Sequence, residues 1–210
     1  MIPVKVLAVR YLANGEPELA KALGAPEGYP SLGMLTTDCD DATYIALDAA
    51  TKAAEVEVAY GRSFYAGAAN ASTPNAGEVI GILAGRTPGA VRSGMEAALS
   101  ALERLGFDET QGVPYLAHTV SSVGSFLAKE ARIPVGQALA YLIAPPLEGM
   151  YALDAALKAA DVKLCKLYAP PSETNFGGGL LTGTQSACEA ACAAFAAAVA
   201  EVAEKPIDKL

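Results

Sequence analysis

The alternation of hydrophobic and polar residues predicts the same order of elements twice along the chain. Short runs rich in apolar and β-branched residues favour strands, and longer amphipathic segments rich in alanine favour helices. In the first half the predicted strands are 4–12, 32–36, 56–60 and 78–84, and the predicted helices are 16–23, 41–55 and 88–105. In the second half the predicted strands are 115–120, 138–144, 162–168 and 179–182, and the predicted helices are 124–131, 147–161 and 184–204. The pattern therefore predicts an α+β fold made of two units in tandem.

The amino-acid sequence itself is repeated. Residues 46–56 are ALDAATKAAEV and residues 152–162 are ALDAALKAADV, which are identical at nine of eleven positions. Leu19-Ala20-Lys21 likewise recurs as Leu127-Ala128-Lys129. The copies lie about half the chain apart, a spacing far longer than the roughly 20–50 residues of solenoid repeats. The chain is therefore two copies of one compact unit, and we expect a pseudo-twofold relation in any ring that it builds.

The expected boundary between the copies lies in the middle of the chain. Residues 106–114 contain Gly, Asp, Glu, Thr and Pro, a composition that favours a linker. We predict a first domain over residues 1–107 and a second over 108–210. The helices are dominated by alanine, which favours helix but buries little apolar area. This predicts an obligate oligomer.

Composition excludes several classes of function. The chain has a net charge of −8 and no tract of Lys or Arg, which argues against binding to nucleic acid. The N-terminus lacks a basic start followed by a long apolar core, so we expect no signal peptide. No apolar run of about 18 residues is free of charged or turn residues, so we expect no membrane span.

Catalytic and metal-binding motifs are scarce. Cys188 and Cys192 lie four residues apart on one helix face and could supply two soft ligands, but no nearby His or Cys completes a tetrahedral set. Packing in the core is favoured for both, and a structural role is favoured for His118. Gly177-Gly178-Gly179 lacks the setting of a dinucleotide fingerprint, so a flexible hinge is predicted. Without a nucleophile elbow or a phosphate loop, an enzyme is not expected.

Two segments break the repeat. The first copy has Thr37-Asp38-Cys39-Asp40-Asp41 where the second has Ala144-Pro145-Pro146-Leu147-Glu148. Neighbouring carboxylates repel one another unless a cation or hydrogen-bond donors offset their charge. Asp40 or Asp41 could cap the following helix, or the acids could bind a small cation such as a protonated amine, and these hypotheses are compatible. The second segment, residues 170–179, is either an exposed mobile loop or a gate at an opening.

The repeated string D-A-A-x-K-A-A-x-V resembles the signature helix of bacterial microcompartment shell domains. The strings AGEVIGILAG, AYLIAPPLE and PPSETNFGGGLLTGTQSACEAAC resemble, more specifically, shell proteins of the ethanolamine-utilisation type, and the likeness covers nearly the whole chain. The resemblance implies two circularly permuted, ferredoxin-like shell domains. It also implies a pseudohexameric homotrimer that tiles with neighbouring shell proteins around a cytoplasmic microcompartment.

The resemblance also implies a site. Small pores in each trimer would bind ethanolamine, while a larger central pore would be gated by loop movement. The implied ethanolamine ligands are Asp40, Asp41, Glu78, Phe107, Thr174, Asn175 and Phe176. Glu148 matches a position associated with metal binding, so zinc is possible although no cofactor is required. Lys52 and Lys158 would lie at the edge of the tile. Alternatives are a shell protein of another microcompartment type, or a soluble amine-binding protein that does not assemble.

Overall fold

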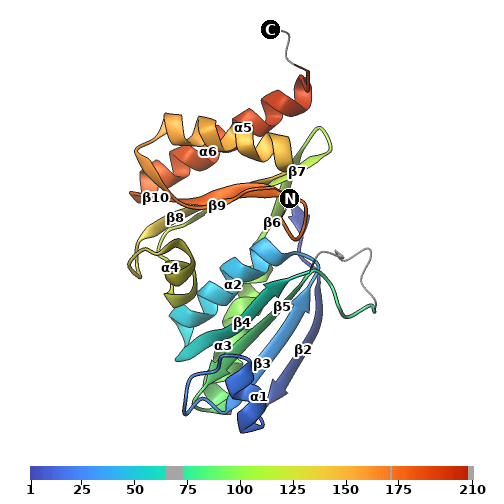
Figure 1. The fold of residues 1–210 in the computed structure, drawn as a ribbon, viewed down its shortest axis with the longest axis vertical. Helices are drawn as coiled ribbons and strands as arrows, with labels where there is room; N and C mark the ends of the chain where they lie inside the picture. Colours follow the sequence, from blue (N-terminus) through green and yellow to red (C-terminus); the bar gives the residue numbers. More distant parts are fainter. Residues whose placement is uncertain (65–72, 171, 208–210) are drawn as a thin grey trace. The chain divides into compact units, whose positions relative to one another are not determined.

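The computed structural model describes residues 1–64, 73–170 and 172–207. The chain divides into two compact units. The first-half unit comprises Pro3–Gly106 together with Gly124–Leu127, and the second-half unit comprises Met1–Ile2, Phe107–Val123 and Ala128–Leu210. Each unit is built around one antiparallel sheet that carries two long helices (Figure 1).

The first-half unit has a four-stranded sheet in the order β2-β3-β5-β4. Its strands are β2 (Val6–Leu12), β3 (Ser31–Thr37), β4 (Val56–Ser63) and β5 (Val79–Gly85), and its helices are α1 (Pro17–Ala22), α2 (Asp40–Ala53) and α3 (Pro88–Leu102). Glycines on the sheet bring the long helices close. A Cβ on Gly81 would lie 2.7 Å from Leu47 Cδ1 of α2, and one on Gly33 would lie 2.7 Å from Val91 Cγ1 of α3. The helices therefore pack directly on the strand backbone.

The second-half unit has a six-stranded sheet in the order β1-β6-β7-β8-β10-β9. Its strands are β1 (Ile2–Pro3), β6 (Gly106–Thr110), β7 (Val113–Val120), β8 (Ala138–Ala144), β9 (Val162–Tyr168) and β10 (Gly177–Gly183). Its long helices are α5 (Pro146–Ala159) and α6 (Gln185–Glu204); the short helix α4 (Ser125–Ala131) begins within residues that belong to the first-half unit. Strands β8 and β9 have the predicted bounds.

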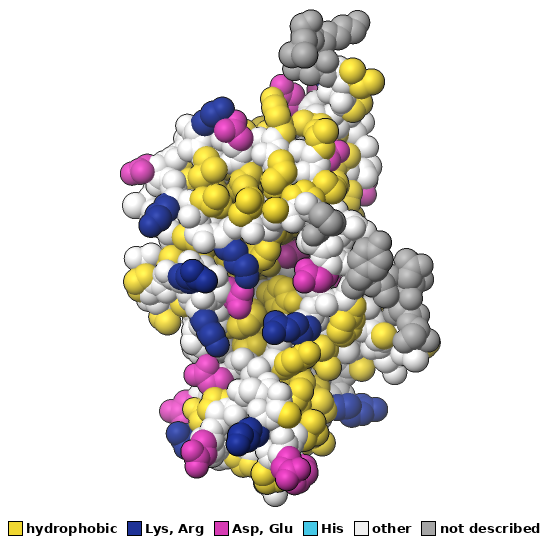
Figure 2. Space-filling model, viewed as in Figure 1, with side chains coloured by type: hydrophobic (Ala, Val, Ile, Leu, Met, Phe, Trp, Pro, Cys, Tyr) yellow, Lys and Arg dark blue, Asp and Glu magenta, His cyan; other side chains and the backbone are white. Residues whose placement is uncertain are grey.

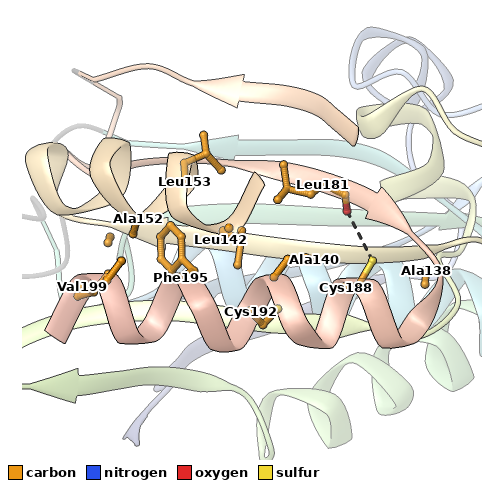
Figure 3. Close-up of a cluster of buried hydrophobic side chains, with 14 residues drawn as sticks. Ala138, Ala140, Leu142, Ala152, Leu153, Leu181, Cys188, Cys192, Phe195 and Val199 are labelled. Carbon is orange, nitrogen blue, oxygen red and sulfur yellow. Dashed lines mark hydrogen bonds between the residues drawn. The ribbon is translucent and has the colours of Figure 1, made fainter. Parts of the chain in front are cut away.

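The core of the second-half unit lies between its sheet and helices α5 and α6 (Figure 3). Phe195 and Val199 of α6 meet Leu142 of β8 and side chains of α5. Cys188 and Cys192 belong to this buried cluster, and the Cys188 thiol donates to the Leu181 carbonyl at 4.0 Å. The prediction that both cysteines pack in the core is confirmed.

Helix α6 is the described helix whose length and mean hydropathy, 1.5, would by themselves allow a membrane crossing. The expectation from the sequence was that no segment would span a membrane. The side chains of Cys188, Phe195 and Val199 are fully buried against the sheet, while Glu189 and Glu201 are exposed on the other face of the helix. The packing is that of a core helix with one buried and one solvated face.

The linker predicted at residues 106–114 is wrong, because this segment forms the hairpin of β6 and β7. Asp108 pairs with Tyr115 and Thr110 with Val113. The two residues of the loop, Gln111 and Gly112, have φ values of 50° and 81°. Left-handed backbone at both positions matches the twist of a two-residue hairpin. The composition indicated a turn correctly, but the flanking residues pair as strands.

The glycine hinge is also wrong. Gly177-Gly178-Gly179 begin the interior strand β10, are buried, and pair with β8 at Ala144, Ile143 and Leu142. At Gly178 φ is 154°, and an added Cβ would overlap the Leu142 carbonyl. The glycines serve close backbone packing within a sheet, because no other residue has room there.

Candidate functional site

The chain turns from β3 into α2 through the acidic segment. Thr37 Oγ accepts from the Cys39 N–H at 3.2 Å and lies 2.7 Å from Thr43 Oγ. Cys39 is the N-cap residue, and its side chain makes no capping hydrogen bond. Asp40 and Asp41 occupy the first turn, so the prediction that one of them caps α2 is wrong. Their carboxylates lie instead at the positive end of the helix dipole, which favours negative charge.

Asp40 and Asp41 are buried, with exposed fractions of 8% and 7%. Asp40 Oδ1 accepts from the Asp41 N–H at 2.9 Å, and the Ser63 side chain also hydrogen-bonds Asp40. Ser63 Oγ lies 2.6 Å from the Tyr44 hydroxyl. With Asp40 ionised, Ser63 donates its one proton to the carboxylate, so Tyr44 is the donor to Ser63. Burial raises the pKa of Asp40 above its ordinary value, although the bonds from Ser63 and Asp41 oppose the shift.

Sheet register brings Glu78 to the same place. Thr37 pairs with Val79, and the Glu78 N–H donates to the Thr37 carbonyl at 2.8 Å. Gly77 has a φ of 65°, and an added Cβ there would overlap the Thr37 carbonyl. The glycine before Glu78 in the AGEV string therefore permits the close approach of the two segments.

Cys39 lies among these acids. Burial raises the pKa of its thiol, and the negative charges of Asp41, Asp40 and Glu78 raise it further. The thiol is therefore neutral, and all three carboxylates lie close enough to raise the pKa of the same sulfur atom. We call Asp40, Asp41 and Glu78 the acidic cluster. The third aspartate of the segment is Asp38. Its carboxylate accepts from the Lys5 N–H at 2.7 Å in an exposed position, which fixes the residue just before β2.

The other predicted ethanolamine ligands lie in the second-half unit. The rings of Phe107 and Phe176 meet edge to face, with centroids 5.6 Å apart. Ser172 holds the turn that precedes β10: its Oγ accepts from the Phe176 N–H at 3.2 Å, and its carbonyl accepts from the Asn175 N–H at 3.2 Å. Asn175 has a φ of 63°, which asparagine tolerates, and it is exposed, while Thr174 is half-buried. The predicted ligands thus form two groups, one in each unit.

Glu148 lies half-buried in the first turn of α5. Within residues 1–64, 73–170 and 172–207, no group of three or more His, Cys, Asp or Glu side chains is arranged to hold a metal ion. Among the described residues of one chain, Glu148 therefore has no further metal-ligating side chains grouped with it, and the zinc site stays a prediction.

Sequence reasoning missed a third buried carboxylate, Asp48 in the repeated helix. Its Oδ2 accepts from the Gly124 N–H at 2.7 Å and its Oδ1 from the Leu127 N–H at 2.9 Å. Lys52 Nζ lies 3.4 Å from Oδ2. Thr51 Oγ accepts from the Ser125 N–H at 3.1 Å. Asp48 and Thr51 therefore satisfy the free N–H groups at the start of α4, as an N-cap side chain would. Their spacing on α2, and the match of Asp48 with Asp154 in the repeat, were the only signals in the sequence.

Comparison with known proteins agrees with this fold. The BMC domain family matches residues 31–113. The chain is 59% identical to the bacterial microcompartment shell protein EutL of Clostridium perfringens, over 99% of this chain and 97% of that protein. It is 48% identical to EutL of Escherichia coli K12, over 100% of this chain and 97% of that protein. The crystal structure of the ethanolamine utilization protein EutL from Leptotrichia buccalis superposes with a TM-score of 0.96 at 58% identity, covering 99% of this chain and 98% of that one. The chain therefore belongs to the EutL family of bacterial microcompartment shell proteins, which are structural rather than catalytic and form part of a shell within the bacterial cytoplasm.

Proposed function

We propose that this shell protein forms a homotrimeric tile of an ethanolamine-utilisation microcompartment and that its acidic cluster binds ethanolamine. The burial of Asp40 and Asp41 beside Glu78 is the observation that supports ethanolamine as the ligand. Protonated ethanolamine offers an ammonium group, and carboxylates stabilise ammonium through charge-assisted hydrogen bonds. Buried acids without a cation would repel one another and take up protons, in line with the raised pKa of Asp40.

The remaining proposed ligands are Phe107, Thr174, Asn175 and Phe176. The ordered turn at Ser172 supports a defined position for the last three of these within their own unit. Backbone N–H and hydroxyl groups of such a turn can hydrogen-bond a hydroxyl group, which ethanolamine also carries.

The proposed tile rests on the duplication. Two shell domains, with the boundary proposed between residues 107 and 108, would give three chains the outline of a hexagon. A central pore would open and close by loop movement, and ligand binding would bias it only through different affinities for the two states. Lys52 and Lys158 would face neighbouring tiles, and Glu148 would contribute to a zinc site in the assembled shell.

Calorimetry tests the ligand. Asp41→Asn and Glu78→Gln should each weaken ethanolamine binding about tenfold or more, because each removes a charge-assisted hydrogen bond. Asp38→Asn is the matched control, because its carboxylate serves the Lys5 N–H and lies outside the cluster. Wild-type affinity in both cluster variants would exclude the proposed ligand site.

Electron microscopy of the purified protein tests the tile. Flat sheets or hexagonal plates are expected. Isolated protomers at high concentration would contradict the tile and favour the alternative of an amine-binding protein that does not assemble.

A further inference from the structure

Two hydroxyl side chains, Tyr44 of α2 and Ser63 at the end of β4, connect the acidic cluster to the surrounding fold. Ser63 hydrogen-bonds the Asp40 side chain, and Ser63 Oγ lies 2.6 Å from the Tyr44 hydroxyl. An ionised carboxylate only accepts, so with Asp40 charged Ser63 donates to it and Tyr44 donates to Ser63. The two donors therefore form a chain of hydrogen bonds that ends on one carboxylate.

The Tyr44 ring is held from two sides within the first-half unit. A Cβ on Gly61 would lie 3.3 Å from Tyr44 Cε1, so the missing side chain lets the ring lie directly on β4. The Phe126 ring packs against the Tyr44 ring, with centroids 5.9 Å apart and planes tilted by 44°. Phe126 lies in the first turn of α4, whose N–H groups are bound by Asp48 and Thr51. The Tyr44 hydroxyl is therefore fixed by packing that does not depend on a ligand.

Strand geometry identifies the residue of the second copy that corresponds to Ser63. Edge strands β4 and β9 both begin at the last of the repeated eleven residues. Each has one bulge at the same place, at Ala59 in β4 and at Cys165 in β9. The two strands therefore match residue for residue beyond the bulge, and Ala169 corresponds to Ser63.

The acids and the hydroxyls are absent together from the second copy. All four positions are apolar there, with Pro146, Leu147, Met150 and Ala169 in the places of Asp40, Asp41, Tyr44 and Ser63. In agreement, Figure 2 shows hydrophobic side chains gathered over β9 and the adjoining part of α5. A hydroxyl pair needed only for the fold would be expected in both copies, because both place the repeated helix beside the edge strand. A pair that serves the acids is expected only where the acids are, and this second pattern is the one found.

We propose that Ser63 and Tyr44 are positioning residues of the ethanolamine site, which hold the Asp40 carboxylate charged and in one orientation so that it can accept an ammonium group. Burial disfavours the charge on Asp40, and a hydrogen bond donated to the carboxylate offsets part of that cost. A protonated carboxyl group would carry no charge to attract a cation. Ser63 and Tyr44 thus act through Asp40 rather than on the ligand. The inference rests on the proposed function, since it assigns further residues to the same site.

Calorimetry of ethanolamine binding across pH tests Ser63. Ser63→Ala should weaken binding about tenfold at neutral pH, because Asp40 loses a hydrogen bond to its charged form. The bond from Ser63 lowers the pKa of Asp40, so its loss raises that pKa and moves the fall in affinity to higher pH. The loss should therefore shrink as pH rises while ethanolamine remains protonated. The other titratable groups around Asp40 include Asp41, Cys39 and Glu78, and Ser63→Ala leaves all three in place.

A conservative variant of the same residue distinguishes the hydroxyl from the shape of the side chain. Ser63→Thr keeps the hydroxyl and suits a strand, so it should bind ethanolamine as the wild type does. Circular dichroism establishes that each variant is folded.

Tyr44 has its own variant. Tyr44→Phe keeps the ring and removes only the donor to Ser63, so binding should weaken severalfold, less than in Ser63→Ala, because Asp40 keeps its hydroxyl donor. The double variant Tyr44→Phe/Ser63→Ala should bind no more weakly than Ser63→Ala alone, because Tyr44 acts through Ser63. Tyr60→Phe is the matched control, since Tyr60 lies on the same strand with its side chain among apolar residues of the opposite sheet face.

The outcomes separate this inference from the proposed function. A wild-type protein that does not bind ethanolamine would overturn both. Weakened binding in Asp41→Asn together with wild-type affinity in Ser63→Ala and Tyr44→Phe at every pH would overturn the inference and leave the ligand site standing. A loss in Ser63→Ala that is the same at every pH, or losses that add in the double variant, would also overturn it, because neither is expected of residues that act through the charge on Asp40.

Discussion

Helices α2 and α5 carry nearly the same eleven residues, yet they differ in what surrounds them. In α2, Asp48 is buried and accepts two backbone N–H groups. In α5, Asp154 makes a solvated i,i+4 ion pair with Lys158 at 2.6 Å. The shared sequence encodes a helix with an acid and a lysine one turn apart. The role of the acid depends on which segment covers it.

The two helices also begin differently. Helix α2 starts with Asp40 and Asp41, supported by Tyr44 and Ser63, whereas α5 starts at Pro146 after a proline N-cap. Aligned on their N-caps, Cys39 and Pro145, the helices place Met150 opposite Tyr44. The alignment read from the sequence, with Glu148 opposite Asp41, is therefore wrong by one residue, and Leu147 takes that place. The second copy therefore lacks the adjacent pair of acids and their hydroxyl support, so the acidic part of the proposed amine site belongs to the first copy alone.

The largest effect should come from removing the buried acid. Asp48→Ala leaves the Gly124 and Leu127 N–H groups without their acceptor and should lower the free energy of unfolding by about 3 kcal/mol. Asp154→Ala removes only an exposed ion pair and should cost less than about 0.5 kcal/mol in a dilute protomer. Urea denaturation measures both. Equal costs would show that the two environments do not differ energetically.

Two glycines of the second-half unit provide the next contrast. Gly178 of β10 has no room for a side chain, so Gly178→Ala should destabilise the protein by about 2–4 kcal/mol. Gly112→Ala is the control: its φ is also positive, at 81°, but no atom lies within 4 Å of an added Cβ. It should cost only the roughly 1 kcal/mol of left-handed backbone. Thermal unfolding of both variants separates the cost of the steric clash from the cost of left-handed backbone. Equal losses of stability in the two variants would argue against a clash.

The smallest effect concerns Asp40 and has the opposite sign. Because its pKa is raised in the folded protein, the folded state binds the proton more tightly, and stability falls as pH rises from the unfolded pKa through the folded one. Asp40→Asn should therefore raise the melting temperature of the ligand-free protein at neutral pH, by about 2–4 °C for each 1 kcal/mol.

Scanning calorimetry across pH checks the sign. The gain in Asp40→Asn should shrink as pH falls toward 3.8, the ordinary aspartate value. Asp38→Asn should show no such gain. A lower melting temperature in Asp40→Asn at neutral pH would mean that the site stabilises its own charge without a cation.

Sequence alone determined the elements with strong local signals. Residues 138–144 and 162–168 are strands with the predicted bounds, because each is a short apolar or alternating run bounded by turn residues. The duplication was equally plain, since identical residues at a fixed spacing need no structure to detect. The acids at positions 40 and 41 were also visible, because they break the repeat.

Only tertiary structure decided what these residues contact. Glu78 joins Asp40 and Asp41 because β3 and β5 pair with Thr37 opposite Val79, a register that no local pattern contains. Gly177–Gly179 form a buried strand rather than a hinge because neighbouring backbone fills the space that side chains would need. Asp48 and Asp154 are the sharpest case: local sequence is the same, and burial, which comes from segments distant in the chain, makes one a structural acceptor and leaves the other in solvent.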